Sequence, residues 1–176
     1  ESALYVSKEA EKTSISVMDA PVSGGVVGAE NGTLTFMVGG TKKAYDKIEP
    51  YFLIMGQKCV LCGGPGAGQS AKICNNMILG ISMIGVCEAF NLAHKLNLNW
   101  DRLFDVVSTS SGSCWSVNTY CPAPGVGPES PADKDYKPGF AADLMLKDLK
   151  LSQEAAKSVS APTELGKHAT EIYETF

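Results

Sequence analysis

Apolar residues in the first 63 positions fall into short runs separated by glycines, a pattern typical of strands. Runs of strand length occur at 15–19, 34–38 and 59–62. Between the second and third runs, apolar residues recur at three- and four-residue steps, which predicts a helix over 42–55 ended by Gly56. A further helix is expected at 1–12, directly before the first strand, as if the chain begins in the middle of a domain.

A change of pattern at Gly68 predicts one long helix that continues to Leu98. Over this stretch apolar residues keep helical spacing without a proline, and they cover most of the circumference. Such a helix must be covered on several sides. The remaining chain supplies only shorter helices, predicted over 100–108, 113–120, 141–158 and 163–176. Burial against a second chain would complete the cover of the long helix.

Prolines recur between Cys121 and Gly139, where they forbid a regular helix and predict an extended loop. Strands are therefore confined to the front of the chain. The sequence predicts a mainly α fold with two parts. Residues 65–176 form an all-helical domain built on one long central helix, and residues 1–64 supply the strands and one helix that precede it.

Composition narrows the class of protein. The 176 residues are 44% hydrophobic, which is enough for one well-buried core. The net charge is −4 and the basic residues are scattered, so we expect no nucleic-acid partner. The longest uncharged apolar stretch, from Asn75 to Cys87, is shorter than the roughly 20 residues that span a bilayer, and no leader pattern stands at Glu1, so we expect no membrane insertion. The six cysteines are irregularly spaced, which favours reduced, buried thiols in a reducing compartment.

The first candidate binding element is the stretch Asp19 to Gly25, which reads DAPVSGG. Serine followed by two glycines leaves consecutive backbone N–H groups without side-chain cover, and a hydroxyl lies beside them. Such a concave array of donors suits an anion, for example a carboxylate. The plainer interpretation is a tight turn with no ligand.

A second stretch, GAGQSA from Gly66 to Ala71, fits the relaxed dinucleotide fingerprint G-x-G-x-x-A, with Glu88 about twenty residues further on. The context of that fingerprint is a short helix followed by a second strand. Here the helix is far too long and Glu88 lies inside it. We therefore reject this stretch as a cofactor site.

The start of the long helix carries a polar group of unusual composition. Lys72, Asn75 and Asn76 are three and four residues apart, so an amine and two amides share one helical face. Burial would lower the lysine pKa and let the amine exchange a proton near neutral pH. The alternative is a lysine that extends from the helix end to solvent.

The cysteines, the histidines and the stretch from Phe140 give little indication of function by themselves. Cys59 and Cys62 form a C-x-x-C without a second pair or a histidine cluster, so we expect no metal site. His94 and His168 lack the partners of a catalytic triad. The stretch FAADLMLKDL from Phe140 reads, by itself, as an ordinary amphipathic helix.

Four stretches together resemble the 3-hydroxyisobutyrate dehydrogenases in order and spacing over nearly the whole chain: DAPVSGG from Asp19, KICNN from Lys72, SSGSCWS from Ser110 and LMLKDL from Leu144. The first two also occur in β-hydroxyacid dehydrogenases that act on other short acids. The third, followed by TYCPAPG from Thr119, is closer to the 3-hydroxyisobutyrate branch.

The resemblance implies a role for each matching residue. Lys72 matches the catalytic lysine and Asn76 a substrate-binding asparagine, while Ser23, Gly24 and Gly25 match the carboxylate-binding turn. Lys147 matches a lysine that reaches the nicotinamide cofactor and Phe140 an aromatic residue close to it; Trp115 is implied to line the substrate pocket.

The implied reaction is the reversible NAD(P)-dependent oxidation of 3-hydroxyisobutyrate to methylmalonate semialdehyde in valine catabolism, with NAD, or NADP, as hydride carrier. The resemblance also implies a homodimer or tetramer formed through the long helix. It places the enzyme in the mitochondrial matrix of a eukaryote or the cytoplasm of a bacterium. Reduction of a related semialdehyde such as tartronate semialdehyde remains an alternative, as does a noncatalytic dimerisation module, against which Lys72 and the intact turn argue.

The chain departs from the family in one respect. The family begins with a Rossmann domain, and residues 1–64 match only its last strands and helix, so the phosphate-binding fingerprint and the ribose-binding acid are not in this sequence. We therefore expect that the chain alone binds the cofactor weakly and has little or no activity.

Overall fold

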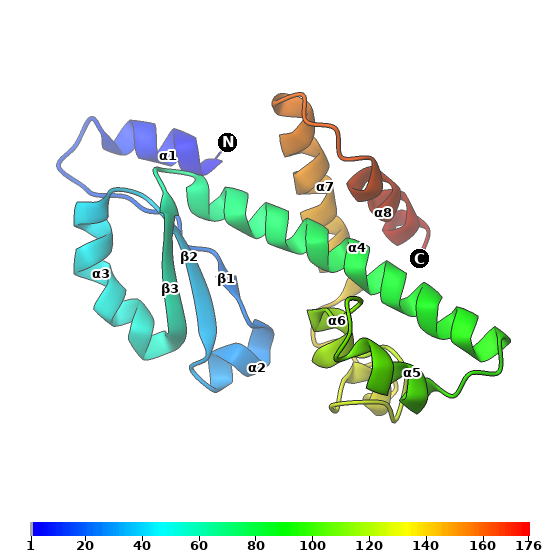
Figure 1. Cartoon of the computed structure of the whole chain (residues 1–176). Helices are drawn as coiled ribbons and strands as arrows, with labels where there is room; N and C mark the ends of the chain where they lie inside the picture. The colour runs from blue at the N-terminus through cyan, green and yellow to red at the C-terminus, as the bar shows by residue number, and fades with distance from the viewer. Residues whose placement is uncertain (1) are drawn as a thin grey trace. The chain divides into compact units, whose positions relative to one another are not determined.

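The computed structural model describes residues 2–176, which form two compact units (Figure 1). The first unit extends to Asn75 and the second runs from Asn76 to Phe176. One helix, α4 (Ala67–Lys95), begins in the first unit and continues into the second. Each unit is described separately below.

The first unit is built on a three-stranded sheet in the order β1-β2-β3. Strands β2 and β3 are parallel and are joined by α3, which makes a strand–helix–strand crossover, whereas β1 is antiparallel to β2. Side chains from β2 and α3 form the core of this unit, and Phe36 stacks on Phe52 with 4.5 Å between ring centroids. The elements are α1 (Ser2–Ala10), β1 (Val22–Ser23), α2 (Gly25–Glu30), β2 (Leu34–Gly39), α3 (Lys42–Met55) and β3 (Gly56–Gly63).

Two of the three predicted strands and the helix between them are confirmed, and α3 has the predicted bounds. The strand predicted at 15–19 is wrong. Asp19 alone pairs there, in an isolated bridge with Gly39, and the edge position beside β2 is taken by Val22 and Ser23. Pro21 lies between these two pairings and has no N–H to donate, so the ladder cannot extend as a regular strand. The short helix α2 was not predicted.

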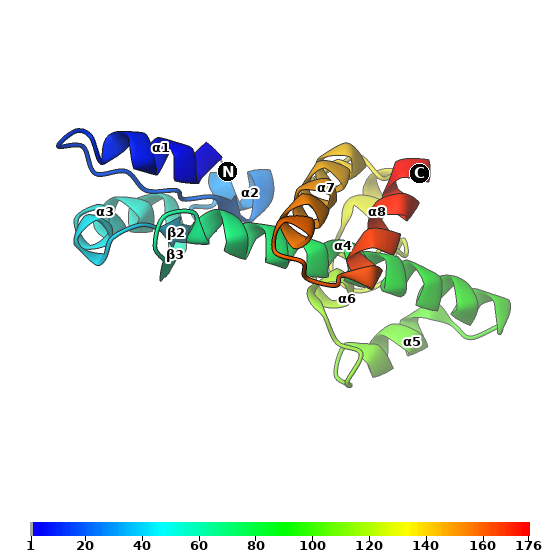
Figure 2. The ribbon, with the colours of Figure 1, turned by 90° about the horizontal axis from the view of Figure 1, so that it is seen from above.

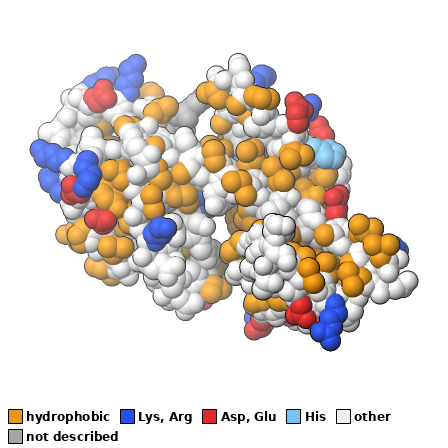
Figure 3. All heavy atoms as spheres, viewed as in Figure 1, with side chains coloured by type: hydrophobic (Ala, Val, Ile, Leu, Met, Phe, Trp, Pro, Cys, Tyr) orange, Lys and Arg blue, Asp and Glu red, His pale blue; other side chains and the backbone are white. Residues whose placement is uncertain are grey.

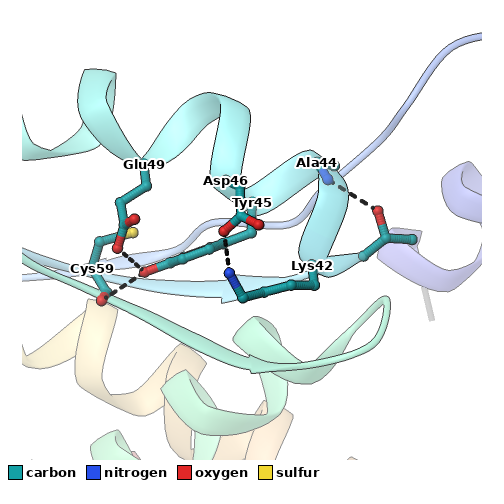
Figure 4. A network of polar contacts seen from close by, with 7 residues as sticks. Lys42, Ala44, Tyr45, Asp46, Glu49 and Cys59 are labelled. Atoms are coloured by element: carbon teal, nitrogen blue, oxygen red, sulfur yellow. Dashed lines mark hydrogen bonds and ion pairs between the residues drawn. The ribbon is translucent and has the colours of Figure 1, made fainter.

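A polar network fastens α3 to β3 (Figure 4). The Tyr45 hydroxyl lies 2.6 Å from a Glu49 carboxylate oxygen and 3.0 Å from the Cys59 carbonyl oxygen. The hydrogen bond to Glu49, together with burial, raises the pKa of Tyr45 above its usual value. Thr41 caps the helix by accepting the backbone N–H of Ala44, so the crossover is fixed at its start and along its length.

The second unit is helical throughout its regular structure, as predicted. Its elements after α4 are α5 (Trp100–Val107), α6 (Trp115–Asn118), the 3-10 helix η1 (Pro131–Lys134), α7 (Ala142–Ser158) and α8 (Glu164–Thr175). Helices α7 and α8 lie side by side in both views (Figures 1 and 2). Met145 and Leu149 of α7 and Ala169 of α8 form one core cluster. A second cluster gathers around Phe90 and Val117.

The proline-rich stretch 121–139 is an ordered loop held by one carboxylate. Asp133 accepts the backbone N–H of Gly125 at 2.6 Å and that of Ser130 at 2.8 Å. These two hydrogen bonds lower the pKa of the Asp133 carboxyl. Ser130 in turn accepts from the backbone of Ala132, which completes a capping box at the start of η1.

Helix α4 is long and apolar enough to cross a membrane, by length and composition alone. This differs from the expectation drawn from its longest uncharged stretch. The core helix of a globular protein can have the same composition, but most of this apolar surface is exposed in the single chain, with Ile78 66% and Leu92 59% exposed. Figure 3 shows further apolar side chains at the surface of both units. The helix therefore offers apolar surface for further packing.

All six cysteines are free, as expected, but the expectation that they are buried is wrong for most of them: only Cys121 is buried, and Cys74 and Cys87 are exposed. Burial raises the pKa of Cys121, which favours the protonated thiol. No group of His, Cys, Asp or Glu among residues 2–176 is arranged to hold a metal ion.

Candidate functional site

Lys72 lies in the second turn of α4, within the first unit. Its ammonium nitrogen donates to the backbone carbonyl of Val22 over 2.8 Å, and the side chain is partly buried. Val22 is the residue directly before the Ser23–Gly25 turn. The structure therefore places the predicted catalytic amine next to the predicted carboxylate-binding turn, although Val22 and Lys72 are far apart in the sequence.

The turn itself adopts a backbone shape that requires glycine. Gly24 has φ of 131° and Gly25 has φ of 61°, and both values lie in the region that side chains rarely adopt. Ser23 pairs with Thr35 of β2, so the sheet fixes the start of the turn, and α2 begins at Gly25. A Cβ atom at Gly25 would meet nothing within 4 Å, so the backbone there can be approached closely.

The glycine-rich stretch at the start of α4 has a structural partner. The Asp19 carboxylate accepts the backbone N–H of Gly66 at 2.6 Å and that of Gln69 at 2.8 Å. A dinucleotide fingerprint would use these N–H groups for a pyrophosphate. Because a carboxylate of the chain holds them, and because Glu88 lies within α4, the geometry supports the rejection of this stretch as a cofactor site. Sequence reasoning did not foresee this role of Asp19.

In the second unit, Asp148 links two of the predicted residues. The Asn76 amide donates to one oxygen of the buried Asp148 carboxylate at 2.5 Å, and the Lys147 ammonium lies 3.2 Å from the other oxygen. Asp148 was not predicted. A signal was available, because it lies on the same face of α7 as the core residues Met145 and Leu149. An acid on the buried face of a helix needs a partner, and Asn76 supplies one.

Of the two predicted aromatic residues, Trp115 contacts Tyr120, and Phe140 follows Gly139, which lies beside the Tyr120 hydroxyl. The Trp115 ring stacks on the Tyr120 ring with 4.9 Å between centroids. The Tyr120 hydroxyl is 2.6 Å from the position a Cβ of Gly139 would take, directly before Phe140. Trp115 is half exposed and Phe140 is 36% exposed, so both rings can contact a ligand. Tyr120 is an aromatic residue that sequence reasoning missed.

The structure thus sorts the predicted residues into two groups. Lys72 and the Ser23–Gly25 turn belong to the first unit, whereas Asn76, Trp115, Phe140 and Lys147 belong to the second. From the resemblance, we expect both groups to serve a dehydrogenase that acts on a hydroxyacid. Comparisons with known proteins test the family.

Two family models match the chain. The model for the NAD-binding domain of 6-phosphogluconate dehydrogenase matches residues 1–64. The model described as NAD-binding of NADP-dependent 3-hydroxyisobutyrate dehydrogenase matches residues 66–176, which is more than half of the chain. The chain belongs to the 3-hydroxyisobutyrate dehydrogenase family.

Individual relatives agree. A probable 3-hydroxyisobutyrate dehydrogenase of Mycobacterium tuberculosis is 48% identical over 167 residues, which cover 95% of this chain and 57% of that protein. The mitochondrial 3-hydroxyisobutyrate dehydrogenase of Homo sapiens is 48% identical over 168 residues, covering 96% of this chain and 50% of that protein. This chain therefore spans about half the length of these curated relatives.

Solved structures show the same fold. The Mycobacterium tuberculosis 3-hydroxyisobutyrate dehydrogenase solved with L-serine superposes with a TM-score of 0.94 at 48% identity, covering 99% of this chain and 60% of that one. A 3-hydroxyisobutyrate dehydrogenase from Salmonella typhimurium gives a TM-score of 0.81 at 28% identity and covers 98% of this chain and 59% of that one. The expectation of the family is confirmed.

Proposed function

We propose that this chain carries the substrate-binding and proton-transfer groups of a 3-hydroxyisobutyrate dehydrogenase. The observation that carries the proposal is the hydrogen bond from the Lys72 ammonium to the Val22 carbonyl, one residue before the Ser23–Gly25 turn. A hydroxyacid bound by its carboxylate at that turn would present its hydroxyl group to Lys72. Membership of the family supports this assignment.

Each group has a part in the reaction. The Ser23 hydroxyl and the backbone of the turn, which is open at Gly25, bind the carboxylate, and this fixes the distance from the carboxylate to the reacting carbon. Lys72 in its neutral form accepts the proton of the substrate hydroxyl as the carbon is oxidised. In the reverse direction its ammonium returns that proton. The resemblance assigns Asn76 to the substrate as well; in the single chain its amide is buried and donates to Asp148, so contact with a substrate would require this amide to become accessible.

The residues proposed to hold the nicotinamide are Lys147 and Phe140. The Lys147 side chain is 61% exposed and Asp148 contacts its ammonium, so the amine is oriented and still accessible to a ligand. The Phe140 ring offers an apolar surface for contact with an aromatic ring. When bound, the nicotinamide supplies the hydride acceptor, and the family supports NAD(P) as that cofactor.

The substrate class follows from the anion-binding turn and from a relative. The Mycobacterium tuberculosis enzyme was solved with L-serine. L-serine and 3-hydroxyisobutyrate share a three-carbon acid with its hydroxyl on the third carbon, and they differ in carrying an amino or a methyl group on the second. We propose the methyl compound as the substrate, since the curated relatives that the chain matches are 3-hydroxyisobutyrate dehydrogenases.

The test compares substrates and one substitution in the gene-encoded full-length protein. Oxidation of 3-hydroxyisobutyrate should exceed that of L-serine, glycerate and 4-hydroxybutyrate in kcat/KM. The variant Lys72→Met keeps the length of the side chain and removes the amine, and it should lower kcat by about 10²- to 10⁴-fold. Lys43→Met changes an exposed lysine of the same unit and serves as the control.

Three results would count against the proposal. Retained activity in Lys72→Met would remove the lysine from its assigned role. Preference for glycerate would favour the tartronate semialdehyde reductase alternative. No turnover of any of these acids with either nicotinamide cofactor would favour a noncatalytic dimerisation module.

We also propose that α4 is an interface between copies of the chain. Its exposed Ile78 and Leu92 side chains support this, because such a surface is stabilised by burial against apolar partners. Sedimentation equilibrium of the full-length protein should give a dimer or tetramer, and Ile78→Glu should shift it toward monomer. Leu165→Glu on α8 changes an equally exposed leucine, 70% exposed, and should not; a monomeric wild-type protein would refute the interface.

A further inference from the structure

Asp19 joins the extended segment 19–23 to the start of α4. Its backbone pairs with Gly39, donating at 3.0 Å and accepting at 2.8 Å, which fixes the residue against β2. Its carboxylate then accepts from Gly66, directly before the helix, and from Gln69 in the first turn. Such hydrogen bonds satisfy N–H groups that have no intrahelical acceptor, and the negative charge is favoured at this helix end.

We infer that Asp19 is a positioning residue for Lys72, an inference that rests on the proposed function of Lys72. The same segment contacts α4 twice, first through the Asp19 carboxylate and again through the Val22 carbonyl that accepts from Lys72. Asp19 and Val22 are three residues apart in the segment, and Gln69 and Lys72 are three residues apart in the helix. The two connections form a closed ring of contacts that includes the residue before the carboxylate-binding turn.

Distances along the two elements explain why both contacts are needed. Three residues of extended chain advance about 10 Å, whereas three residues of helix advance about 4.5 Å. Because the two elements advance by different amounts between the two contacts, one contact alone does not fix how they are aligned. Without the Asp19 contact, we expect the start of α4 to adjust and the Lys72 amine to move relative to Ser23.

Two glycines allow Asp19, β2 and the start of α4 to pack closely together. A Cβ at Gly39 would lie 2.8 Å from the backbone nitrogens of Ala67 and Gly68 and would collide with the Asp19 carboxylate. A Cβ at Gly68 would lie 2.8 Å from an Asp19 carboxylate oxygen and would collide with the Met37 carbonyl. The helix start, the strand β2 and Asp19 are thus in direct backbone contact, and a change at Asp19 is transmitted to α4 rather than absorbed by side-chain movement.

The substitution Asp19→Asn tests the inference with little change in volume. An amide can accept one of the two backbone N–H groups, but its NH₂ group would face the other donor. Asp46→Asn is the matched control, since Asp46 is an exposed carboxylate of the same unit that pairs with Lys42. Both variants would be made in the full-length protein, with urea unfolding to confirm that each is folded.

Two readouts separate positioning from general stability. The first is the rate at which a trace amount of acetic anhydride acetylates Lys72, compared with the rate at Lys43, as measured by mass spectrometry. This ratio reports the environment of the Lys72 amine and does not depend on enzymatic activity. We expect Asp19→Asn to raise the relative rate by about twofold or more, because local opening exposes the amine. The second is steady-state kinetics, in which kcat should fall by about ten- to a hundredfold with KM for the hydroxyacid nearly unchanged.

The outcomes are distinguishable. Unchanged labelling of Lys72 in Asp19→Asn overturns the inference, even if kcat falls. An equal effect in Asp46→Asn also overturns it. Raised labelling in a protein that oxidises no hydroxyacid would sustain the positioning of Lys72 and overturn the proposed function.

Discussion

The substitution Leu149→Ala tests how the second unit holds Asp148 and Lys147 in place. Leu149 follows Asp148 on α7 and is fully buried in the cluster with Met145 and Ala169. Its side chain packs against Gly80 of α4, since a Cβ at Gly80 would lie 3.0 Å from Leu149 Cδ2 and 3.2 Å from Cδ1. The packing of α7 on this part of α4 therefore depends on the contact between Leu149 and Gly80.

The expected cost can be worked out from the atoms removed. Truncation to alanine removes three carbons, which contribute about 2.4 kcal/mol at about 0.8 kcal/mol for each buried carbon group. The cavity left behind adds to this, for a total loss of about 3 to 4 kcal/mol. Leu151 lies on the same helix and is 41% exposed, so Leu151→Ala loses less packing and leaves no closed cavity. It should cost about 1 kcal/mol.

A second substitution makes the test specific to the contact with Gly80. Alone, Gly80→Ala gains about 1 kcal/mol of helix propensity, but its new methyl group crowds Leu149. In the Leu149→Ala protein that crowding is gone and the methyl group fills part of the cavity. We therefore expect Gly80→Ala to be more favourable in the Leu149→Ala background, with a coupling of about 1 to 2 kcal/mol.

Urea unfolding measures these free energies for the wild-type protein, Leu149→Ala, Gly80→Ala and the double variant, with circular dichroism as the signal. Leu151→Ala is carried through the same titration as the control for loss of a leucine from α7. The reasoning is refuted if Gly80→Ala has the same effect in both backgrounds, because the two side chains would then not be in contact. It is also refuted if Leu149→Ala costs no more than Leu151→Ala.

Two further predictions concern the proline-rich loop and the start of α4. The pKa of Asp133 is lowered in the folded state, so its contribution to stability is complete above the unfolded pKa of about 3.9 and is lost as the pH falls below it. Asp133→Asn should therefore be less stable than the wild-type protein at pH 7. Its free energy of unfolding, measured in urea between pH 5 and pH 3, should also depend less on pH. Gly68→Ala should lower the free energy of unfolding by about 2 kcal/mol or more, because the new Cβ collides with the Met37 carbonyl. For the control Gly64→Ala, whose Cβ would meet nothing within 4 Å, this free energy should stay within about 0.5 kcal/mol of the wild-type value. Thermal unfolding measures both.

Periodicity predicted the elements that are long and regular. Helix α3 and the extent of α4 follow from apolar spacing alone, and β2 and β3 follow from apolar runs. The short helix α2 was not predicted, because six residues are too few to show a periodic pattern and its start depends on two glycines with positive φ. The strand expected at 15–19 failed because a run of apolar residues says nothing about whether a partner strand is available.

For the site, the sequence identified residues but not their partners. Helical spacing singled out Lys72 and Asn76, the resemblance added Lys147, and the structure shows contacts of each of them. Asp148 was missed because its stretch was interpreted as an ordinary amphipathic helix, in which the acid was given no partner. Asp19 was included in a quoted motif and yet was given no role, since the two backbone groups that it binds lie far along the chain.

The start of α4 shows how one glycine-rich stretch can suit two uses that the sequence does not distinguish. Glycines at the start of a helix allow close approach to its exposed N–H groups, whether the approaching anion is a pyrophosphate or a carboxylate of the same chain. In this structure the anion is Asp19, which is held at high effective concentration by its pairing with Gly39. A cofactor phosphate would have to displace that carboxylate. Phosphate binding at this turn and the proposed positioning of Lys72 are therefore competing uses of one helix start, and in this structure the Asp19 carboxylate occupies it.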